Sequence, residues 1–217
     1  MNEILQVALF AGQMILENGG ETYRVEETIW RICKIYGADE AESFATPTGI
    51  MASICHQGKT YSLTRRVSNR TVNLDKIDKV NDLSRSIQSK KLSVSDFKRE
   101  LDKINNLNTY SFLIVILFSG LAAGSFSILF GGNFKDAFSA FLIGLLIKGL
   151  ALKWSDVGIN TFFINSICGG ITALLAIIFF KLGISSQINQ TIIGSIMLLV
   201  PGLAITNAIR DTMSGDL

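Results

Sequence analysis

Apolar residues form long uninterrupted runs only in the second half of the chain, after Tyr110. Residues 111–130 are 20 consecutive positions without a charged side chain, and further uncharged runs occupy 137–147, 157–180 and 182–209. An α-helix rises about 1.5 Å per residue, so about 20 residues span a hydrocarbon core of roughly 30 Å. The pattern therefore predicts about four membrane-spanning helices, near residues 111–130, 136–152, 159–181 and 188–207. The second of these includes Lys148, whose amine can snorkel to the membrane interface.

The first 110 residues instead contain short periodic segments of two kinds. Helical spacing of apolar residues predicts helices over 4–16, 22–36, 77–87 and 93–107. Stretches rich in β-branched and aromatic residues predict strands at 43–46, 50–55 and 60–67, with a hairpin loop at 57–59. Residues 71–74 also have the composition of a short strand. We expect an α+β domain of order ααβββαα over residues 1–109, then an α-helical polytopic membrane domain over residues 110–217.

Charge separates the two halves in amount but not in sign. Residues 1–110 hold 15 of the 20 Lys and Arg and 14 of the 18 Asp and Glu. A nucleic-acid-binding surface would need a concentrated basic excess, so we expect no nucleic-acid partner. Basic residues gather just before the first predicted span, which places the first domain in the cytosol and the chain in the cytoplasmic membrane. These residues are Lys90, Lys91, Lys98, Arg99 and Lys103.

The sequence contains no recognisable cofactor or metal motif. Cys33, Cys55 and Cys168 lack metal or redox spacing, and neither a phosphate-binding loop nor a dinucleotide glycine motif occurs. A hydrolase would need a base, a nucleophile and an orienting acid in contact, and His56 is the only histidine. We therefore expect no catalytic residue, cofactor or metal. The alternative is that the first domain is a membrane-anchored hydrolase or a ligand-sensing regulatory subunit, with a hydrolytic site near Glu21, Arg24, Thr48 and His56.

Proline and polar residues interrupt the last apolar run. Pro201 removes a backbone donor and Gly202 loosens the helix, which would leave carbonyl groups unpaired at membrane depth. Transporters use broken helices of this kind to bind substrates or ions, although a simple kink explains these two residues equally well. The residues predicted to line a substrate path are Pro201, Gly202, Asn207 and Arg210, and those predicted to carry a coupling proton are Asp136 and Asp211.

Simpler explanations exist for several of these residues. Arg210 and Asp211 can mark only the cytosolic boundary of the membrane, and an exposed loop position is the commoner case for an aspartate such as Asp136. Glycines at Gly120 and Gly124 form a GxxxG pair, which favours close packing of helices.

Several short motifs occur in an order that resembles one known family. They are Gly20-Glu21-Thr22-Tyr23-Arg24-Val25-Glu26, Pro47-Thr48-Gly49, Asn73-Leu74-Asp75-Lys76 with Val80-Asn81, Gly131-Gly132 before Asp136, and Pro201-Gly202 followed by Asn207-Ala208-Ile209-Arg210-Asp211. Together they cover essentially the whole chain and resemble the threonine/serine exporter family. The similarity is greatest to the large subunit of its split, two-protein form. The cytosolic motif residues are Glu21, Arg24, Glu26, Pro47, Thr48 and Gly49.

The resemblance implies a function that the pattern alone does not give. It implies a subunit of a proton-motive-force-linked secondary exporter of small polar metabolites, either threonine and serine or dicarboxylates such as succinate. A smaller, separate polytopic membrane subunit would supply the rest of the path, and an oligomer is expected because four spans make a small bundle. Family members usually continue past residue 216 into another hydrophobic helix, so we expect this sequence to be truncated at its C-terminus.

Overall fold

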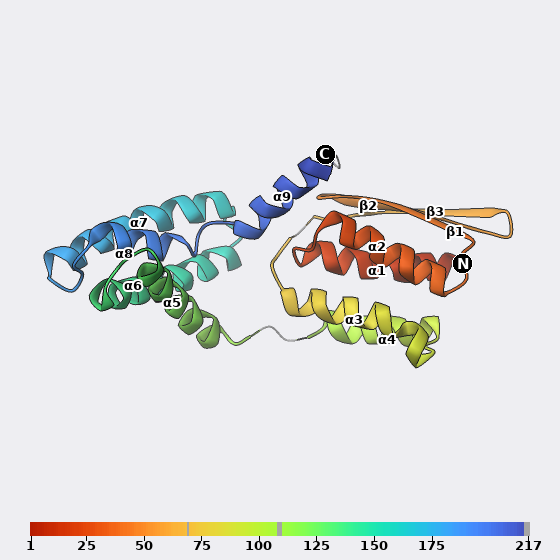
Figure 1. Cartoon of the computed structure of the whole chain (residues 1–217), viewed down its shortest axis with the longest axis horizontal. Coiled ribbons are helices and arrows are strands. Elements are labelled where there is room, and N and C mark those ends of the chain that lie inside the picture. Colours follow the sequence, from red (N-terminus) through yellow and green to blue (C-terminus); the bar gives the residue numbers. More distant parts are fainter. Residues whose placement is uncertain (69, 108–109, 215–217) are drawn as a thin grey trace. The chain divides into compact units, whose positions relative to one another are not determined.

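The computed structural model describes residues 1–68, 70–107 and 110–214, and it divides the chain into two compact units (Figure 1). The first unit consists of Met1–Asn108 together with Gly202–Leu217, and the second of Thr109–Pro201. The predicted domain boundary at residue 109 and the predicted truncation at residue 217 lie outside the described residues. The grouping differs from the predicted domains in one respect, because the segment from Gly202 onward belongs with the first unit.

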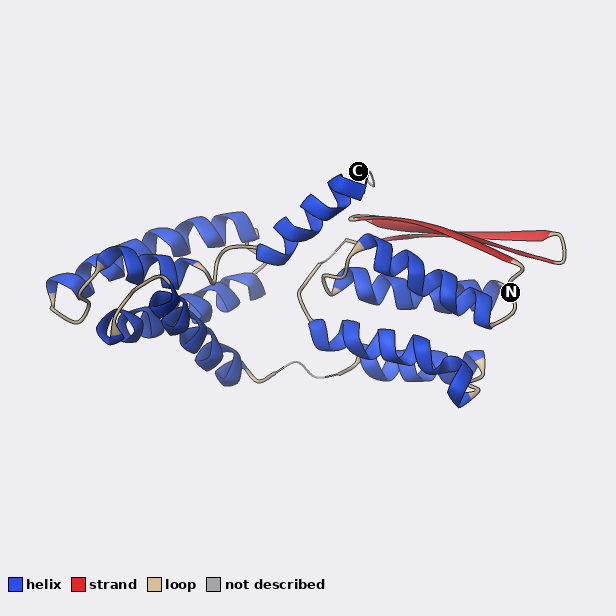
Figure 2. Ribbon diagram, viewed as in Figure 1, coloured by secondary structure: helices blue, strands red, loops and turns tan. Residues whose placement is uncertain are grey.

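The first unit has the predicted order of two helices, three strands and two helices, and one later helix joins it. Its elements are α1 (Asn2–Glu17), α2 (Thr22–Ile35), β1 (Glu40–Thr46), β2 (Gly49–His56), β3 (Lys59–Arg66), α3 (Leu74–Lys90), α4 (Val94–Asn105) and α9 (Gly202–Ser214). The sheet lies on one side of α1 and α2, and α3 and α4 lie on the other (Figure 2). The unit is therefore built in three layers.

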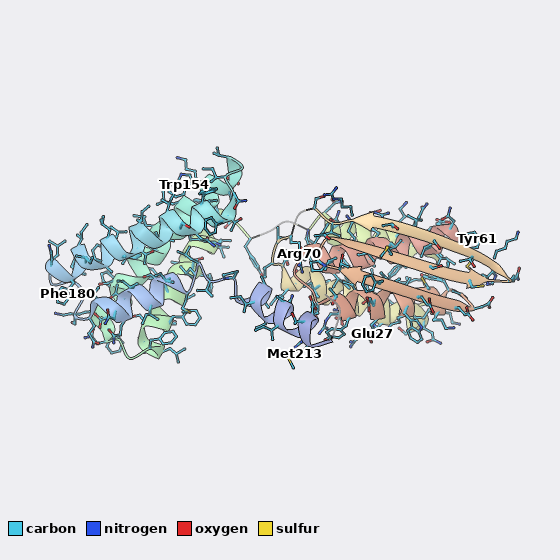
Figure 3. All side chains as sticks on the ribbon, turned by 90° about the horizontal axis from the view of Figure 1, so that it is seen from above. Glu27, Tyr61, Arg70, Trp154, Phe180 and Met213 are labelled. Carbon is cyan, nitrogen blue, oxygen red and sulfur yellow. The ribbon has the colours of Figure 1, made fainter. Side chains whose placement is uncertain are left out.

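The sheet is antiparallel, in the order β1-β2-β3, and only one of its faces is buried. Ile50, Ala52 and Ile54 of β2 point into the core, whereas Phe44 and Met51, paired across β1 and β2, are exposed. Figure 3 views this sheet from above, with the helices behind it. A two-residue turn at Gln57 and Gly58, both with positive φ, closes the β2–β3 hairpin at the predicted loop.

Helix α1 is the centre of the first unit. Its buried side chains from Leu5 to Leu16 contact the sheet on one side and α3 and α4 on the other, and its polar residues are confined to a narrow stripe with Glu3, Gln6, Gln13 and Glu17. A helix with so wide an apolar face is buried over most of its circumference. Gly12 allows α2 to approach closely, since a Cβ at this position would lie 2.7 Å from Cδ1 of Ile29.

The suggested strand at 71–74 is wrong, because this segment closes the end of α1 instead. The amide of Thr71 donates to the carbonyl of Glu17 over 2.7 Å, and that of Asn73 donates to the carbonyl of Asn18 over 3.0 Å. The side chain of Asn73 then caps α3 by accepting from the amide of Lys76. The amides of residues 71 and 73 are thus bonded to carbonyls at the end of α1, and Asn73 caps α3, so these groups do not form sheet hydrogen bonds.

The second unit contains α5 (Phe112–Leu129), α6 (Phe134–Asp156), α7 (Thr161–Lys181) and α8 (Ile188–Ile196). Among the described residues, three helices are long and apolar enough to cross a membrane by length and composition, namely α5, α6 and α7. The second continues to Asp156, beyond the predicted end at 152. Residues 188–207 do not form one helix, since α8 has nine residues and α9 begins only at Gly202. A fourth span therefore stays a prediction.

Glycines bring the helices of the second unit into close contact. A Cβ at Gly120 would lie 2.7 Å from Leu145 on α6, and one at Gly124 would lie 3.0 Å from the carbonyl oxygen of Ala137. A Cβ at Gly194 on α8 would lie 2.7 Å from backbone atoms of α5. Gly169 and Gly170 on α7 have open space around them. The GxxxG pair thus serves helix packing.

Candidate functional site

The predicted break near Pro201 is present and follows the end of α8. The backbone tightens first, with the amide of Leu199 donating to the carbonyl of Ile196 over 2.8 Å, and residues 197–201 then leave the helix. The carbonyl of Leu199 accepts a hydrogen bond from the side-chain amide of Asn165 on α7 over 3.2 Å. A side chain from a neighbouring helix thus satisfies a carbonyl that the break releases.

A polar pocket of about 300 Å³ lies beside this unwound segment within the second unit. Pro201 lines it, whereas Gly202 does not. Its polar members come from two helices, with Lys148 and Ser155 on α6 and Thr161 and Asn165 on α7 or at its start. The remaining wall is apolar, formed by Ile147, Ala151, Leu152, Ile164, Leu198, Leu199 and Val200. A pocket with few polar groups on apolar walls suits a small polar ligand that must be held in one orientation.

A larger groove on α5 does not have this character. It has a volume of about 520 Å³ and is lined by Tyr110, Ile114, Val115, Phe118, Ser119, Ala122 and Leu198. Only two of these side chains carry a hydroxyl, and none carries a charge. We therefore place the polar chemistry of this unit in the smaller pocket.

Asp136 is buried at the start of α6, not exposed as a loop aspartate commonly is. Its Oδ2 accepts from the amide of Asn133, whose side chain caps the helix in return. Its Oδ1 accepts from the hydroxyl of Ser185 and from the amides of Ser186 and Gln187, at 2.7 to 3.0 Å. Oδ1 therefore fastens the α7–α8 connection to the start of α6, and Oδ2 closes the cap of α6 itself.

The start of α2 and helix α9 bring together two sets of residues that the sequence places about 190 positions apart. The Thr22 hydroxyl donates to Oδ1 of Asp211 over 2.9 Å, and the Asn207 amide donates to the carbonyl of Gly19 over 3.0 Å. Arg210 forms an ion pair with Glu21. The predicted path residue Arg210 thus contacts Glu21 of the predicted cytosolic motif, and Asn207 contacts Gly19 just before it.

Glu21 is the charged centre of this cluster. Burial acts to raise the pKa of its carboxyl, but the hydrogen bond and charge of Arg24 and the charge of Arg210 outweigh burial, so the pKa lies below its ordinary value. Arg24 contacts Glu21 over 2.8 Å, and this hydrogen bond raises the pKa of the guanidinium. A cavity of about 340 Å³ lies beside the cluster, lined by Gly19, Gly20, Glu21, Arg24, Leu74, Ile77, Asp78, Asn81, Leu203 and Asn207.

The other residues of the cytosolic motif hold the sheet in place. Oε1 of Glu26 accepts from the amide of Ala45 over 2.8 Å, which joins α2 to β1. Pro47, Thr48 and Gly49 form the turn into β2, and the Thr48 carbonyl accepts from the amide of Val67. Their position indicates a role in folding.

The residues suggested for a hydrolytic site do not meet. Thr48 precedes β2 and His56 ends it, so eight residues of extended strand, roughly 26 Å, separate them. Nδ1 of His56 lies 3.7 Å from Oδ2 of Asp39, and the hydroxyl of Ser53 pairs with that of Ser62. No observation here favours a hydrolase built on these residues.

Sequence reasoning did not place Lys148 and Asn165 together in one pocket, as the structure does. A lysine inside an apolar run was a visible signal, but its helix was expected to end one turn later. Asn165 has no sequence signal of its own, because its partner carbonyl is 34 residues away and is released only by the break.

Comparison with known proteins gives a consistent result. Residues 6–217 match the family model described as "Putative threonine/serine exporter". The chain is 26% identical over 221 residues to the "Probable succinate transporter subunit YjjP" of Klebsiella aerogenes, covering 98% of this chain and 81% of that protein. It is 24% identical to the protein of the same name from Escherichia coli K12, with 99% and 84% covered.

A third relative is matched over a smaller part. The "Threonine/serine exporter" of Corynebacterium glutamicum is 27% identical over 154 residues, which cover 69% of this chain and 32% of that protein. No solved structure is significantly similar to this chain.

Proposed function

The chain belongs to the threonine/serine exporter family, and we propose that it is the large subunit of a secondary exporter for small polar metabolites. The cargo we infer is threonine and serine or a dicarboxylate such as succinate, which are the substrates in the names of its relatives. These substrates share a carboxylate and a polar group on a short carbon chain.

The observation that carries this proposal is the polar pocket beside the unwound segment. Pro201 and its neighbours open the backbone next to Lys148, Asn165 and Thr161, between helices that are otherwise apolar. Discontinuous helices with polar groups at the break are the substrate sites of many secondary transporters. Pro201 is therefore the predicted path residue that we assign to this pocket.

Coupling to the proton motive force is the finer part of the proposal. Of the two predicted carboxylates, Asp136 is occupied by four donors, three from the α7–α8 connection and one from the cap of α6. We therefore assign the coupling proton to Asp211, which is buried and has the Thr22 hydroxyl as its hydrogen-bond donor. Gly202, Asn207 and Arg210 would act with Asp211. For this, Asn207 and Arg210 would first release their partners Gly19 and Glu21.

A second subunit completes the path in this proposal. Two of the matching relatives are named as subunits of a transporter. A smaller polytopic membrane protein would supply the missing helices, and the pair would assemble into an oligomer with the first unit in the cytosol. Residues 188–207 would provide the fourth span together with that partner.

Efflux measurements test this function directly. Cells that express the chain with its smaller partner, and are loaded with labelled threonine, serine or succinate, should release at least one of them faster than cells without the chain. An uncoupler that removes the proton gradient should abolish the difference. The function is refuted if correctly inserted protein releases none of the three.

The cavity next to Glu21 favours one other role for the same chain. Its acidic, basic and amide side chains suit a small zwitterion, so the first unit could act as a ligand-sensing subunit. Titration of the whole chain with labelled serine separates the roles. Binding that Asp78→Asn abolishes without slowing efflux would indicate sensing.

A further inference from the structure

We propose that Lys148 is the carboxylate-binding residue of the pocket beside the helix break, with Asn165 as the residue that positions the unwound segment around it. The proposal rests on the exporter function above and names the chemical group that the site would recognise. That group is the carboxylate common to α-amino acids and dicarboxylates.

The position of Lys148 along α6 is the first argument. The helix ends at Asp156, eight residues or about 12 Å beyond Lys148. Lys148 is half-buried and lines the pocket, whereas Lys153 on the same helix is exposed and does not. A lysine near the end of a span reaches the interface easily, but one more than two turns inside the helix reaches it only in part.

The second argument is that this lysine has no counter-ion among the described residues. Over residues 1–68, 70–107 and 110–214, no carboxylate forms an ion pair or hydrogen bond with Lys148, and no lining residue of the pocket is acidic. Ionisable groups inside membrane segments are costly and are commonly paired or functional. The pocket therefore carries one positive charge that an anionic ligand can neutralise.

The surroundings strengthen the attraction for an anion. Ile147, Ala151, Leu152 and Ile164 form apolar walls of the pocket that Lys148 lines, and opposite charges attract more strongly where water is scarce. The hydroxyls of Ser155 and Thr161 can donate hydrogen bonds to the same ligand.

Asn165 acts on the backbone. Its Nδ2 is engaged by the Leu199 carbonyl, so the amide fixes the path of the segment that forms one wall. We class it as a positioning residue, whose loss would weaken binding of every ligand of the pocket alike.

The test compares ligands with and without a carboxylate. The chain and its partner subunit are expressed together, and inhibition of labelled-substrate efflux is measured for serine and for serinol. Serinol keeps the ammonium of serine and has a hydroxymethyl group in place of the carboxylate. For a dicarboxylate exporter the matched pair is succinate and succinamide. Variants are Lys148→Gln, Lys148→Arg and the control Lys153→Gln.

The proposal expects Lys148→Gln to weaken inhibition by the carboxylate ligand about tenfold without weakening inhibition by the matched analogue that lacks the carboxylate. Lys148→Arg should recover most of the loss, and Lys153→Gln should behave as the parent chain. An equal loss for both ligands, or no loss for either, overturns the proposal and indicates that Lys148 only reaches the interface. If Lys148→Gln does not insert, the same ligand pair measured on the uncharged and more apolar Lys148→Met decides, since a loss confined to the carboxylate ligand supports the proposal and an equal loss or no loss refutes it. Absence of efflux in the parent chain refutes the exporter function itself.

Discussion

Thr22, the first residue of α2, donates its hydroxyl hydrogen bond to the buried carboxylate of Asp211 on α9 over 2.9 Å. Asp211 is therefore joined to the first turn of α2. The contact joins positions 189 residues apart and places α9 in the first unit.

Removing this hydroxyl should loosen α9. Thr22→Val leaves the shape nearly unchanged but deprives the buried Asp211 of its donor, so we expect a loss of about 1–3 kcal/mol in the stability of the first unit. Thr212→Val is the control, because Thr212 is exposed and bonds only to the Ala208 carbonyl of its own helix. Thermal unfolding in detergent, followed by protease cleavage of α9, measures both. Equal melting curves for the two variants would contradict the contact.

The stability of the same cluster should depend on pH through Glu21. The pKa of this carboxyl is lowered from 4.5 in the folded chain, so its contribution is present above about pH 4.5 and is lost as the pH falls through the folded pKa. The difference in melting temperature between the parent chain and Glu21→Gln should therefore shrink as the pH falls from about 6 to about 3. A difference that stays constant over this range would show that the ion pairs with Arg24 and Arg210 do not act as described.

Substitution by alanine should destabilise one glycine position of the membrane unit and leave another unaffected. A Cβ at Gly194 would lie 2.7 Å from Ala123 O and 2.7 Å from Ser127 N, which are backbone atoms that cannot turn aside. Gly194→Ala should cost about 1–3 kcal/mol and broaden the size-exclusion profile. Gly170→Ala enters open space and should behave as the parent chain. Similar profiles for both variants would refute the packing of α8 on α5.

Asp136 should prove to be an anchor. Asp136→Ala removes four hydrogen bonds and leaves the amides of Ser186 and Gln187 without their acceptor, so we expect a loss of about 2–4 kcal/mol, measured by detergent unfolding. Asp156→Asn, at the exposed end of α6, is the control. If Asp136→Asn is as stable as the parent chain but its efflux no longer depends on the proton gradient, the coupling proton belongs to Asp136 and not to Asp211.

Cys33 reports on the core of the first unit. Burial raises the pKa of its thiol to about 12, so almost no reactive thiolate exists at neutral pH. Iodoacetamide should leave Cys33 unmodified in the native protein and label it only in denaturant, as peptide mass spectrometry would show. Labelling of native Cys33 at a rate near that of the denatured chain would contradict the burial of α2.

The sequence predicts those features that depend on neighbours in the chain. Ser93 caps α4 and accepts from the amide of Asp96 as expected, and the hairpin turn falls at Gln57 and Gly58. Both depend on a few adjacent residues. The suggested strand at 71–74 failed because its amides bond to the end of α1, a contact that no local pattern reveals.

The functional residues follow the same division. The break at Pro201 was visible, because proline and glycine act locally on the backbone. The pairing of Arg210 with Glu21 was not, because it joins segments separated by almost the whole chain. Lys148 was predicted to lie near the membrane interface because its helix was expected to end at residue 152. Helix α6 continues to Asp156, since its end depends on where the last turn is capped and not on apolar content alone.

The first unit is formed by two separate segments of the chain, and this affects how it folds. It is a discontinuous domain, completed by a helix that is translated only after the membrane helices. Glu21 and Thr22 must wait for Arg210 and Asp211, so the domain reaches its final packing after α5, α6 and α7 have been synthesised. Deleting residues after Gly202 would therefore alter a surface near the N-terminus, and expressing residues 1–107 alone would yield a domain that lacks one of its helices.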